Sequence, residues 1–143
     1  DIALAEYYFA LALLGFLITK LLLWSRKMSD AFVIDRLAFF QRWSINLFSA
    51  LIVSGILVHL FKNIFGRLRP HKSPDYSAFE FSPFNFHWDW LSFPSGHSQV
   101  LFTVATLFAV AFPKFRSALF TVAGFLALTR VTIQYHYLSD VLF

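Results

Sequence analysis

Residues 92–112, SFPSGHSQVLFTVATLFAVAF, decide the fold. The stretch opens with a polar turn that contains a proline, a glycine and a histidine, and from Val100 it continues as an almost purely apolar run. Such a run lacks the polar face of a surface helix in a soluble protein. It therefore predicts a helix that enters a membrane directly after the turn, which leaves the turn at the membrane surface.

The composition of the whole chain agrees with a membrane protein. Of its 143 residues 58% are hydrophobic, only 14% are charged and 20 are phenylalanine, and the mean hydropathy is +0.63. The chain has no cysteine, which excludes disulfides and thiolate metal sites. The net charge of +4 comes without any basic tract, so no nucleic-acid partner is expected.

Four apolar stretches can each cross about 30 Å of hydrocarbon. They are residues 2–24, 43–61, 99–112 and 117–133, and a fifth stretch begins near His136. We therefore expect an all-α fold, a polytopic transmembrane helix bundle with four full spans and a truncated fifth. The chain starts at Asp1 and stops inside an apolar run, so we interpret residues 1–143 as one transmembrane domain that is incomplete at both ends.

Basic residues predict the orientation of this bundle. The linkers 25–42 and 113–116 together carry six basic residues, against four in the longer loop 62–98. Cytoplasmic loops are enriched in lysine and arginine. The two shorter linkers are therefore predicted to be cytoplasmic, and the long loop and the segment after Ile133 share the opposite face.

This topology brings polar groups from three distant segments to one face of the membrane. Lys62 and Arg69 are seven residues apart, so they share a helix face if the second span continues that far, and Pro70 would then end the helix. His136 and Asp140 are four apart at the start of the next helix. The carboxylate can then lie near one imidazole nitrogen and fix its tautomer.

The polar turn itself predicts a cradle for an anion. Pro94 suits the first turn of a helix, where its missing N–H is not needed. Ser95, Gly96 and His97 would then present free backbone N–H groups at the positive end of the helix dipole, and the glycine lets an anion approach closely. The fixed cations expected around the cradle are Lys62, Arg69 and Arg130. Such a group suits a dianionic phosphoryl group better than a single charge.

These residues resemble the motifs of a known family. The patterns Lys62-x6-Arg69-Pro70, Pro94-Ser95-Gly96-His97 and Thr129-Arg130-x5-His136-x3-Asp140 are similar to the three signature motifs of the type-2 phosphatidic acid phosphatase superfamily. Its members are integral-membrane lipid phosphate phosphatases, usually with six spans, so the resemblance implies that this chain is a fragment of a six-span protein. Soluble vanadium haloperoxidases share the site, but the hydrophobicity of this chain excludes them. Thr129 stands where the family has serine and keeps the hydroxyl.

The resemblance implies a mechanism without a metal or another cofactor. His136 would attack phosphorus to form a phosphohistidine while Asp140 holds and polarises its ring, and His97 would protonate the leaving alkoxide. The remaining groups would stabilise the equatorial oxygens: Lys62, Arg69, Arg130 and the backbone amides of Ser95 and Gly96.

The function predicted is hydrolysis of the phosphate of a membrane lipid at the non-cytoplasmic face of a bacterial inner membrane, facing the periplasm or exterior. The partners implied are the bilayer and the phosphorylated lipid, while the oligomeric state stays open. Candidate substrates are phosphatidylglycerol phosphate, undecaprenyl pyrophosphate, phosphatidic acid and lipid A, and the form FGRLRP of residues 65–70 resembles lipid A-type phosphatases. A phosphotransferase with the same nucleophile and a non-enzymatic transport protein are the alternatives.

Other residues near the motifs have simpler interpretations. His59 lies inside the second span and is expected to pack structurally or to support the site indirectly. Arg67 and Lys72 flank the first motif, where they either contact a head group or are solvated loop charges. The aromatic residues between Phe79 and Phe93 predict an interfacial belt that keeps the long loop against the bilayer.

Overall fold

The computed structural model describes residues 5–24 and 30–143, and most of these residues lie in helices. The helices are α1 (Ala5–Trp24), α2 (Ala31–Phe65), α3 (Gly96–Ala111), α4 (Arg116–Thr132) and α5 (Leu138–Leu142), with short 3-10 turns at Pro70–Lys72, Trp88–Trp90 and Pro113–Phe115. The only strand-like pairing in the described residues is an isolated bridge between Arg67 and Phe81. The predicted all-α class is therefore confirmed.

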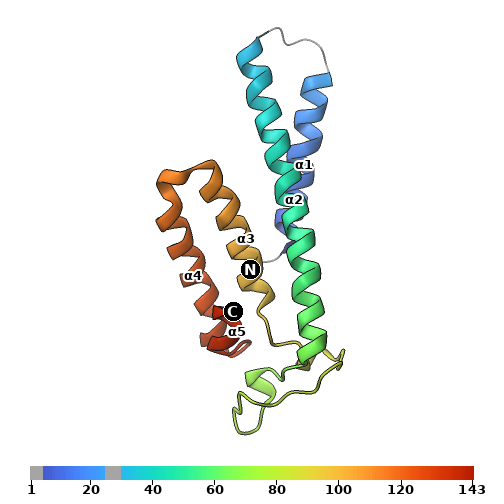
Figure 1. The fold of residues 1–143 in the computed structure, drawn as a ribbon, viewed down its shortest axis with the longest axis vertical. Coiled ribbons are helices and arrows are strands. Elements are labelled where there is room, and N and C mark those ends of the chain that lie inside the picture. The colour runs from blue at the N-terminus through green and yellow to red at the C-terminus, as the bar shows by residue number, and fades with distance from the viewer. Residues whose placement is uncertain (1–4, 25–29) are drawn as a thin grey trace.

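The helices form two hairpins, α1 with α2 and α3 with α4, and α2 packs against α3 (Figure 1). The long loop between α2 and α3 lies at the lower end in this view, and α5 returns to the same end beside the foot of α4. The chain thus gathers its first motif, its polar turn and its C-terminal residues at one end of the bundle, as the topology predicts.

Helix α2 begins earlier than predicted. Its N-cap is Asp30, whose side chain accepts a hydrogen bond of 2.9 Å from the N–H of Phe32. Residues 31–42 were expected to be a linker, but they contain no glycine or proline that would end a helix, so α2 runs for 35 residues, about 52 Å. Arg36 and Arg42 therefore lie on α2, and Arg26 and Lys27 lie outside the described residues.

Helix α2 also ends earlier than the first motif requires for a shared helix face. Gly66 caps it with a left-handed backbone, φ +56°, and its N–H donates to the Lys62 carbonyl at 2.8 Å. Any Cβ at this position would come within 1.8 Å of the Ser82 carbonyl oxygen. Lys62 is thus on the helix, whereas Arg69 lies beyond the cap on extended backbone. The prediction that one helix carries both cations, with Pro70 ending it, is wrong.

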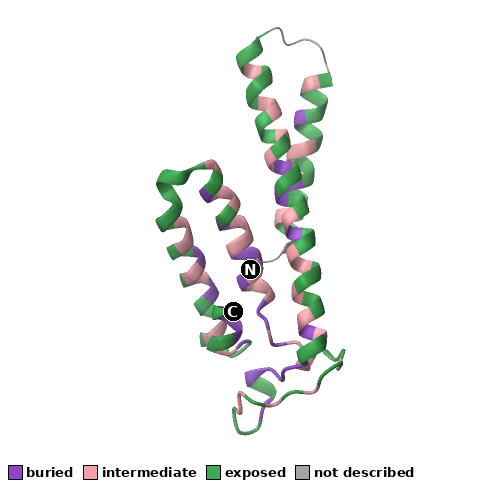
Figure 2. Cartoon of the chain, viewed as in Figure 1, coloured by how far each residue is buried: buried purple, intermediate pink, exposed green. Residues whose placement is uncertain are grey.

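The surfaces of α1 and α2 are those of helices in lipid. They are the two described helices long and apolar enough to cross a membrane, yet only 11% and 17% of their apolar windows are buried. A core helix of a soluble protein would be mostly buried, while here most residues of both helices are exposed or half-buried (Figure 2), and many of the exposed ones are large and apolar. Helices α3 and α4 have 16 and 17 residues. The count of four full spans and a fifth stays a prediction.

Small side chains hold the helices together. Ala12 of α1 packs with Leu47 and Leu51 of α2 and Val100 of α3. A second cluster joins α3, α4 and α5: Leu101, Ala105, Ala123, Ala127 and Val141. Alanine at such contacts lets helix backbones approach closely where the surrounding solvent is apolar. Helix α3 belongs to both clusters, so it fixes the polar turn at its N-terminus relative to α2 and α5.

Candidate active site

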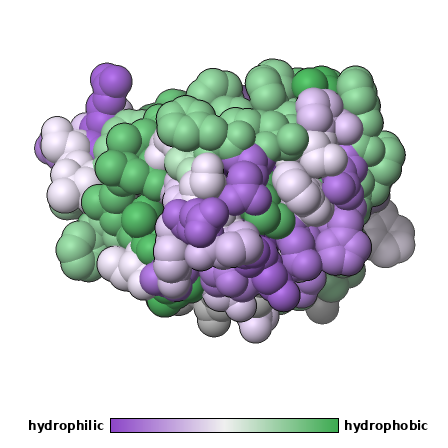
Figure 3. Space-filling model, turned by 90° about the horizontal axis from the view of Figure 1, so that it is seen from below, coloured by the Kyte–Doolittle hydropathy of each residue, from purple (hydrophilic) through white to green (hydrophobic). Residues whose placement is uncertain are grey.

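Polar residues collect at the end of the bundle where the long loop and α5 lie. Seen from that end, they form a continuous hydrophilic area with hydrophobic residues above and beside it (Figure 3). A cavity of about 490 Å³ lies here between α1, α2, α3 and the loops. Among the residues that line it are five predicted site residues: Lys62, Arg69, Gly96, His97 and His136. The structure therefore brings together residues from all three motifs.

The two histidines of the motifs face each other in this cavity. His97 comes from the first turn of α3, and His136 comes from the loop between α4 and α5. Their ring centroids are 6.3 Å apart, with an interplanar angle of 62°. At this separation both rings can contact one bound group, as a nucleophile and a proton donor must.

The ring of His136 is fixed by a backbone carbonyl. Its Nδ1 lies 2.7 Å from the carbonyl oxygen of Ser92, and the residue is only 2% exposed. Because a carbonyl can only accept a hydrogen bond, Nδ1 carries the proton and Nε2 keeps a lone pair. The Asp140 carboxylate is near, as expected, but its Oδ2 is 3.7 Å from Nδ1, which is too long for a hydrogen bond. The tautomer is thus set first by Ser92.

Burial keeps His136 neutral. Loss of solvent lowers the pKa of its imidazole below the ordinary value, and the nearby charges of Lys62 and Arg69 lower this pKa further. The Asp140 carboxylate raises the pKa but does not outweigh the burial. A neutral imidazole with a free Nε2 lone pair is the form that a nucleophile requires.

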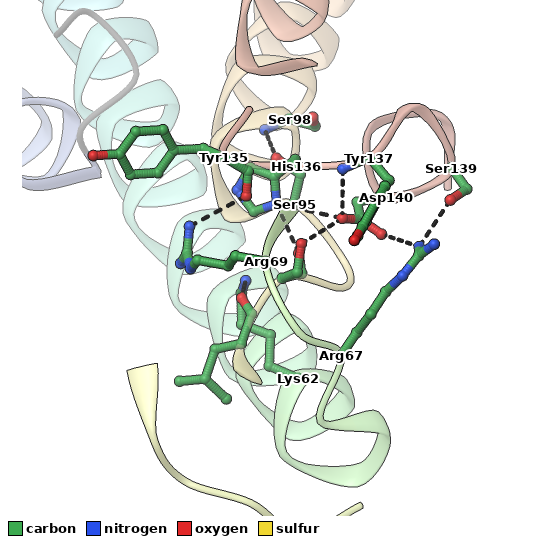
Figure 4. Close-up of polar contacts among 12 residues, drawn as sticks. Lys62, Arg67, Arg69, Ser95, Ser98, Tyr135, His136, Tyr137, Ser139 and Asp140 are labelled. Carbon is green, nitrogen blue, oxygen red and sulfur yellow. Dashed lines mark hydrogen bonds and ion pairs between the residues drawn. The ribbon is translucent and has the colours of Figure 1, made fainter. Parts of the chain in front are cut away.

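Asp140 is the centre of a buried hydrogen-bond network (Figure 4). The residue is 1% exposed. One carboxylate oxygen forms an ion pair with Arg67, and the other accepts from the Ser92 hydroxyl at 2.6 Å and from the N–H of Tyr137 at 2.9 Å. Its backbone carbonyl accepts from the N–H of Ser95 at 2.9 Å. The network thus ties α5 to the loop after α2 and to the polar turn before α3.

The polar turn offers fewer free amides than predicted. Ser95 is the N-cap of α3, so Pro94 precedes the cap and does not belong to the first turn. The Ser95 N–H is occupied by Asp140, and its hydroxyl accepts from the Ser98 N–H at 3.3 Å. The predictions that Pro94 lies in the first turn of the helix and that the Ser95 N–H is free are both wrong, because α3 begins one residue later than assumed. The Gly96 N–H has no acceptor within the described part of the chain, and a Cβ there would lie 3.8 Å from Cε of Lys62.

Two buried basic side chains are held by carbonyl oxygens and not by carboxylates. Lys62 is 6% exposed and its Nζ donates to the Leu91 carbonyl at 2.5 Å. Arg69 is 3% exposed, and it donates to the carbonyls of Trp88 at 3.2 Å and Tyr135 at 3.4 Å. Carbonyl oxygens hold these side chains without neutralising them. Burial lowers the pKa of the Arg69 guanidinium, as expected for a cation held away from water.

The third predicted cation, Arg130, lies in the last turn of α4. Its backbone carbonyl accepts from the N–H groups of Tyr135 at 3.2 Å and His136 at 3.3 Å. The backbone of Arg130 therefore helps to position the segment that carries His136. Its half-buried side chain is not among the residues that line the 490 Å³ cavity.

Sequence reasoning missed two residues of this site. Arg67 is 5% exposed and donates to Ser139 and to the Ala78 carbonyl as well as to Asp140. It is neither solvated nor placed to meet a head group, because the Gly66 cap turns the chain back toward α5. Ser92 is fully buried, and only its place in the quoted polar turn signalled it. Lys72, by contrast, is a partly exposed loop charge 3.9 Å from Asp89.

The described residues contain no group of three or more histidine, cysteine or acidic side chains arranged to hold a metal ion. The site therefore consists of two facing histidines, buried cations and one helix N-terminus at the end of apolar helices. Such a group of residues is suited to bind an anion.

Comparison with known proteins agrees with the geometry. The family model of the PAP2 superfamily matches residues 43–143, so this chain belongs to the PAP2 superfamily. It is also similar to two proteins named Lipid A 1-phosphatase, from Rhizobium etli and Rhizobium johnstonii, with 43% identity to each over 96 residues. The matches cover 67% of this chain but only 41% and 39% of those relatives. No solved structure matches significantly.

Proposed function

We propose that this chain carries the catalytic site of a membrane-bound lipid phosphate phosphatase that acts through a phosphohistidine on His136. The observation that carries the proposal is the hydrogen bond between His136 Nδ1 and the Ser92 carbonyl at 2.7 Å, which leaves Nε2 as the free nitrogen of a cavity-lining ring. The buried cations Lys62 and Arg69 line the same cavity.

The first chemical step transfers the phosphoryl group to the protein. Nε2 of His136 attacks phosphorus, the N–P bond forms, and the bond from phosphorus to the lipid oxygen breaks. His97, on the opposite side, gives its proton to that departing oxygen. Lys62, Arg69 and the Gly96 N–H stabilise the charge on the equatorial oxygens. In the second step His97 takes a proton from water, which attacks the phosphohistidine and releases phosphate. No step requires a metal ion.

The walls of the cavity support a lipid as substrate. Beyond the cations the lining continues with apolar residues of α1, α2 and α3: Phe9, Ile52, Ile56 and Val100. A molecule with a phosphate at one end and an apolar body would satisfy both parts of the cavity. Because both relatives are named Lipid A 1-phosphatase, the 1-phosphate of lipid A is the first substrate to test.

We place the site at the non-cytoplasmic face of a bacterial inner membrane. The turn between α3 and α4 carries Lys114 and Arg116 at the opposite end of the bundle from the site, in agreement with a cytoplasmic location for that turn.

A panel of phosphorylated lipids in detergent tests the proposal. The protein should release inorganic phosphate from lipid A, phosphatidic acid, phosphatidylglycerol phosphate or undecaprenyl pyrophosphate, and the His136→Ala variant should release none. Phosphate release that depends on an added acceptor other than water would instead identify a phosphotransferase. Anion binding without turnover of any lipid would identify a transport protein and overturn the proposal.

A further inference from the structure

The ion pair between Arg67 and Asp140 joins residues 73 positions apart in sequence and is buried, with side-chain exposures of 6% and 0%. Removing two charges from water costs several kcal/mol per ion, so a buried ion pair is weak evidence for a stabilising role. Its location beside the nucleophile offers another reason for its presence.

Every link from Arg67 to His136 is a contact of the described structure. The guanidinium of Arg67 holds one oxygen of Asp140, and the other oxygen accepts the Ser92 hydroxyl at 2.6 Å. The Ser92 carbonyl accepts the proton on Nδ1 of His136 at 2.7 Å. The Ser92 N–H in turn donates to the Arg67 carbonyl at 3.0 Å. Arg67 therefore controls Ser92 both through its own backbone and through Asp140.

The surroundings of Arg67 hold it in this position and away from the substrate. Its guanidinium carbon lies 4.3 Å from the centre of the Tyr137 ring and 5.5 Å from that of Phe81. Its second nitrogen donates to the Ala78 carbonyl at 2.6 Å. Unlike Lys62 and Arg69, it does not line the cavity that contains the two histidines.

We propose that Arg67 is a positioning residue of the phosphatase site, which acts through Asp140 and Ser92 to fix the orientation and the neutral state of the His136 ring. This inference rests on the proposed function. Asp140 then acts as one link of this chain, and its direct distance of 3.7 Å to the ring is explained because Ser92 carries the hydrogen bond.

The charge of Arg67 matters as much as its shape. With Arg67 present, the charge of the carboxylate beside His136 is compensated, so it stabilises an imidazolium less than an unpaired carboxylate would. Removal of Arg67 would leave an uncompensated carboxylate 3.7 Å from Nδ1, which raises the pKa of His136. The other ionisable groups of the cavity come from α1, α2, the following loop and α3: Glu6, His59, Lys62, Arg69 and His97. Among the carboxylates, only Asp140 acts on the pKa of His136.

The test replaces Arg67 with methionine, which keeps much of the stem and removes the charge. With p-nitrophenyl phosphate we expect kcat to fall about 10²-fold, the loss typical of a displaced reacting group, while KM stays within about threefold. The titration midpoint of His136, followed by NMR of its ring carbon, should move to higher pH. Lys72→Met removes a partly exposed cation from the same loop and is the matched control, with no expected change in either measurement.

Three outcomes separate a positioning role from others. A raised KM with unchanged kcat would show that Arg67 contacts substrate, and a lower yield of vanadate-binding protein with an unshifted midpoint would show a purely structural role; both overturn the proposal. If Arg67→Met does not fold, the double variant Arg67→Met/Asp140→Asn removes the unpaired charge as well. Its His136 midpoint should return toward that of the original protein, and a midpoint that stays high would refute the chain of contacts.

The NMR titration requires no turnover, so it separates this inference from the proposed function. Retained activity in His136→Ala would end the proposed function whatever the NMR result. An unshifted midpoint in Arg67→Met, with His136 still essential, would end only the role of Arg67. Arg67→Lys keeps a charge without the forked donors, and it should restore the midpoint more fully than kcat.

Discussion

The two histidines of the cavity should respond differently to the chemistry of the leaving group. If His136 is the nucleophile, its replacement by alanine removes turnover of every substrate, because no covalent intermediate can form. His97 lies in the same cavity, with its ring centroid 6.3 Å from that of His136, and we assign it the role of proton donor to the departing oxygen. A general acid in this position contributes about 10²–10⁴-fold, equivalent to roughly 3–5 kcal/mol of barrier at 1.36 kcal/mol per tenfold.

The loss of kcat/KM in His97→Ala depends on how basic the leaving oxygen is, because a more basic oxygen has a greater need for a proton. A lipid alkoxide is a strong base, so His97→Ala should lose the full 10²–10⁴-fold in kcat/KM on an alkyl phosphate. The anion of p-nitrophenol is stable without a proton, so on p-nitrophenyl phosphate the loss of kcat/KM in His97→Ala should be about tenfold or less. Labelled phosphate should then accumulate on His97→Ala and survive an alkaline denaturing quench, because water activation also slows, and no label should be trapped on His136→Ala.

The assay compares the two variants on both substrates after vanadate binding has established the concentration of folded sites. Equal losses for His97→Ala on the alkyl and aryl phosphates would refute its role as proton donor to the leaving group. A labelled phosphoenzyme in His136→Ala would refute the nucleophile.

Three further predictions concern pH, metal ions and topology. Because burial lowers the pKa of His136, its NMR titration midpoint should lie below the ordinary value of about 6.5, and a midpoint above that value would contradict the burial argument. The unfolded chain then binds a proton more readily at this residue than the folded chain does, so the free energy of unfolding should decrease as the pH falls below about 6.5. EDTA should leave phosphate release unchanged and vanadate should inhibit it, whereas activity lost to EDTA and restored by a divalent ion would contradict the metal-free mechanism. Single cysteines at the exposed positions Asp75 and Lys114 test the orientation in a chain without other cysteines. An impermeant thiol reagent applied from the periplasmic side should label Asp75→Cys alone, and the reverse pattern would invert the orientation.

The sequence predicted the class of the fold and the meeting of the three motifs, because both follow from long-range patterns. Apolar runs identify helices that face lipid, and alternation of the spans brings the ends of distant helices together. The boundaries were less predictable. Hydropathy detects only the part of α2 that suits a membrane, whereas the helix continues wherever nothing breaks its hydrogen bonds, from the Asp30 cap to the left-handed Gly66.

The local contacts of the site could not be predicted from the sequence for a different reason. The pairing of Arg67 with Asp140 depends on the direction in which the chain leaves the Gly66 cap, and the loss of the Ser95 N–H depends on where the Asp140 carbonyl lies. Neither of these two contacts can be predicted from the spacing of residues in the sequence. That spacing identifies residues on the same face of a helix, but it does not identify contacts between two loops. A hydrogen bond from His136 to a main-chain carbonyl has no residue-type signature at all, which is why Ser92 was not predicted.

The pairing of Arg67 with Asp140 also accounts for the charge left in the cavity. Among the described residues Asp140 is the one buried carboxylate, and it lies close to the buried cations Lys62 and Arg69. An unpaired carboxylate there would attract those cations and compete with a phosphate for them. Arg67 approaches Asp140 from outside the cavity and compensates its charge, and the hydrogen bonds of Lys62 and Arg69 go to carbonyl oxygens instead of to this carboxylate. On this argument, one arginine serves both the nucleophile and the anion site: it holds the network that orients His136, and it prevents the carboxylate of that network from neutralising the cations that bind the phosphoryl group.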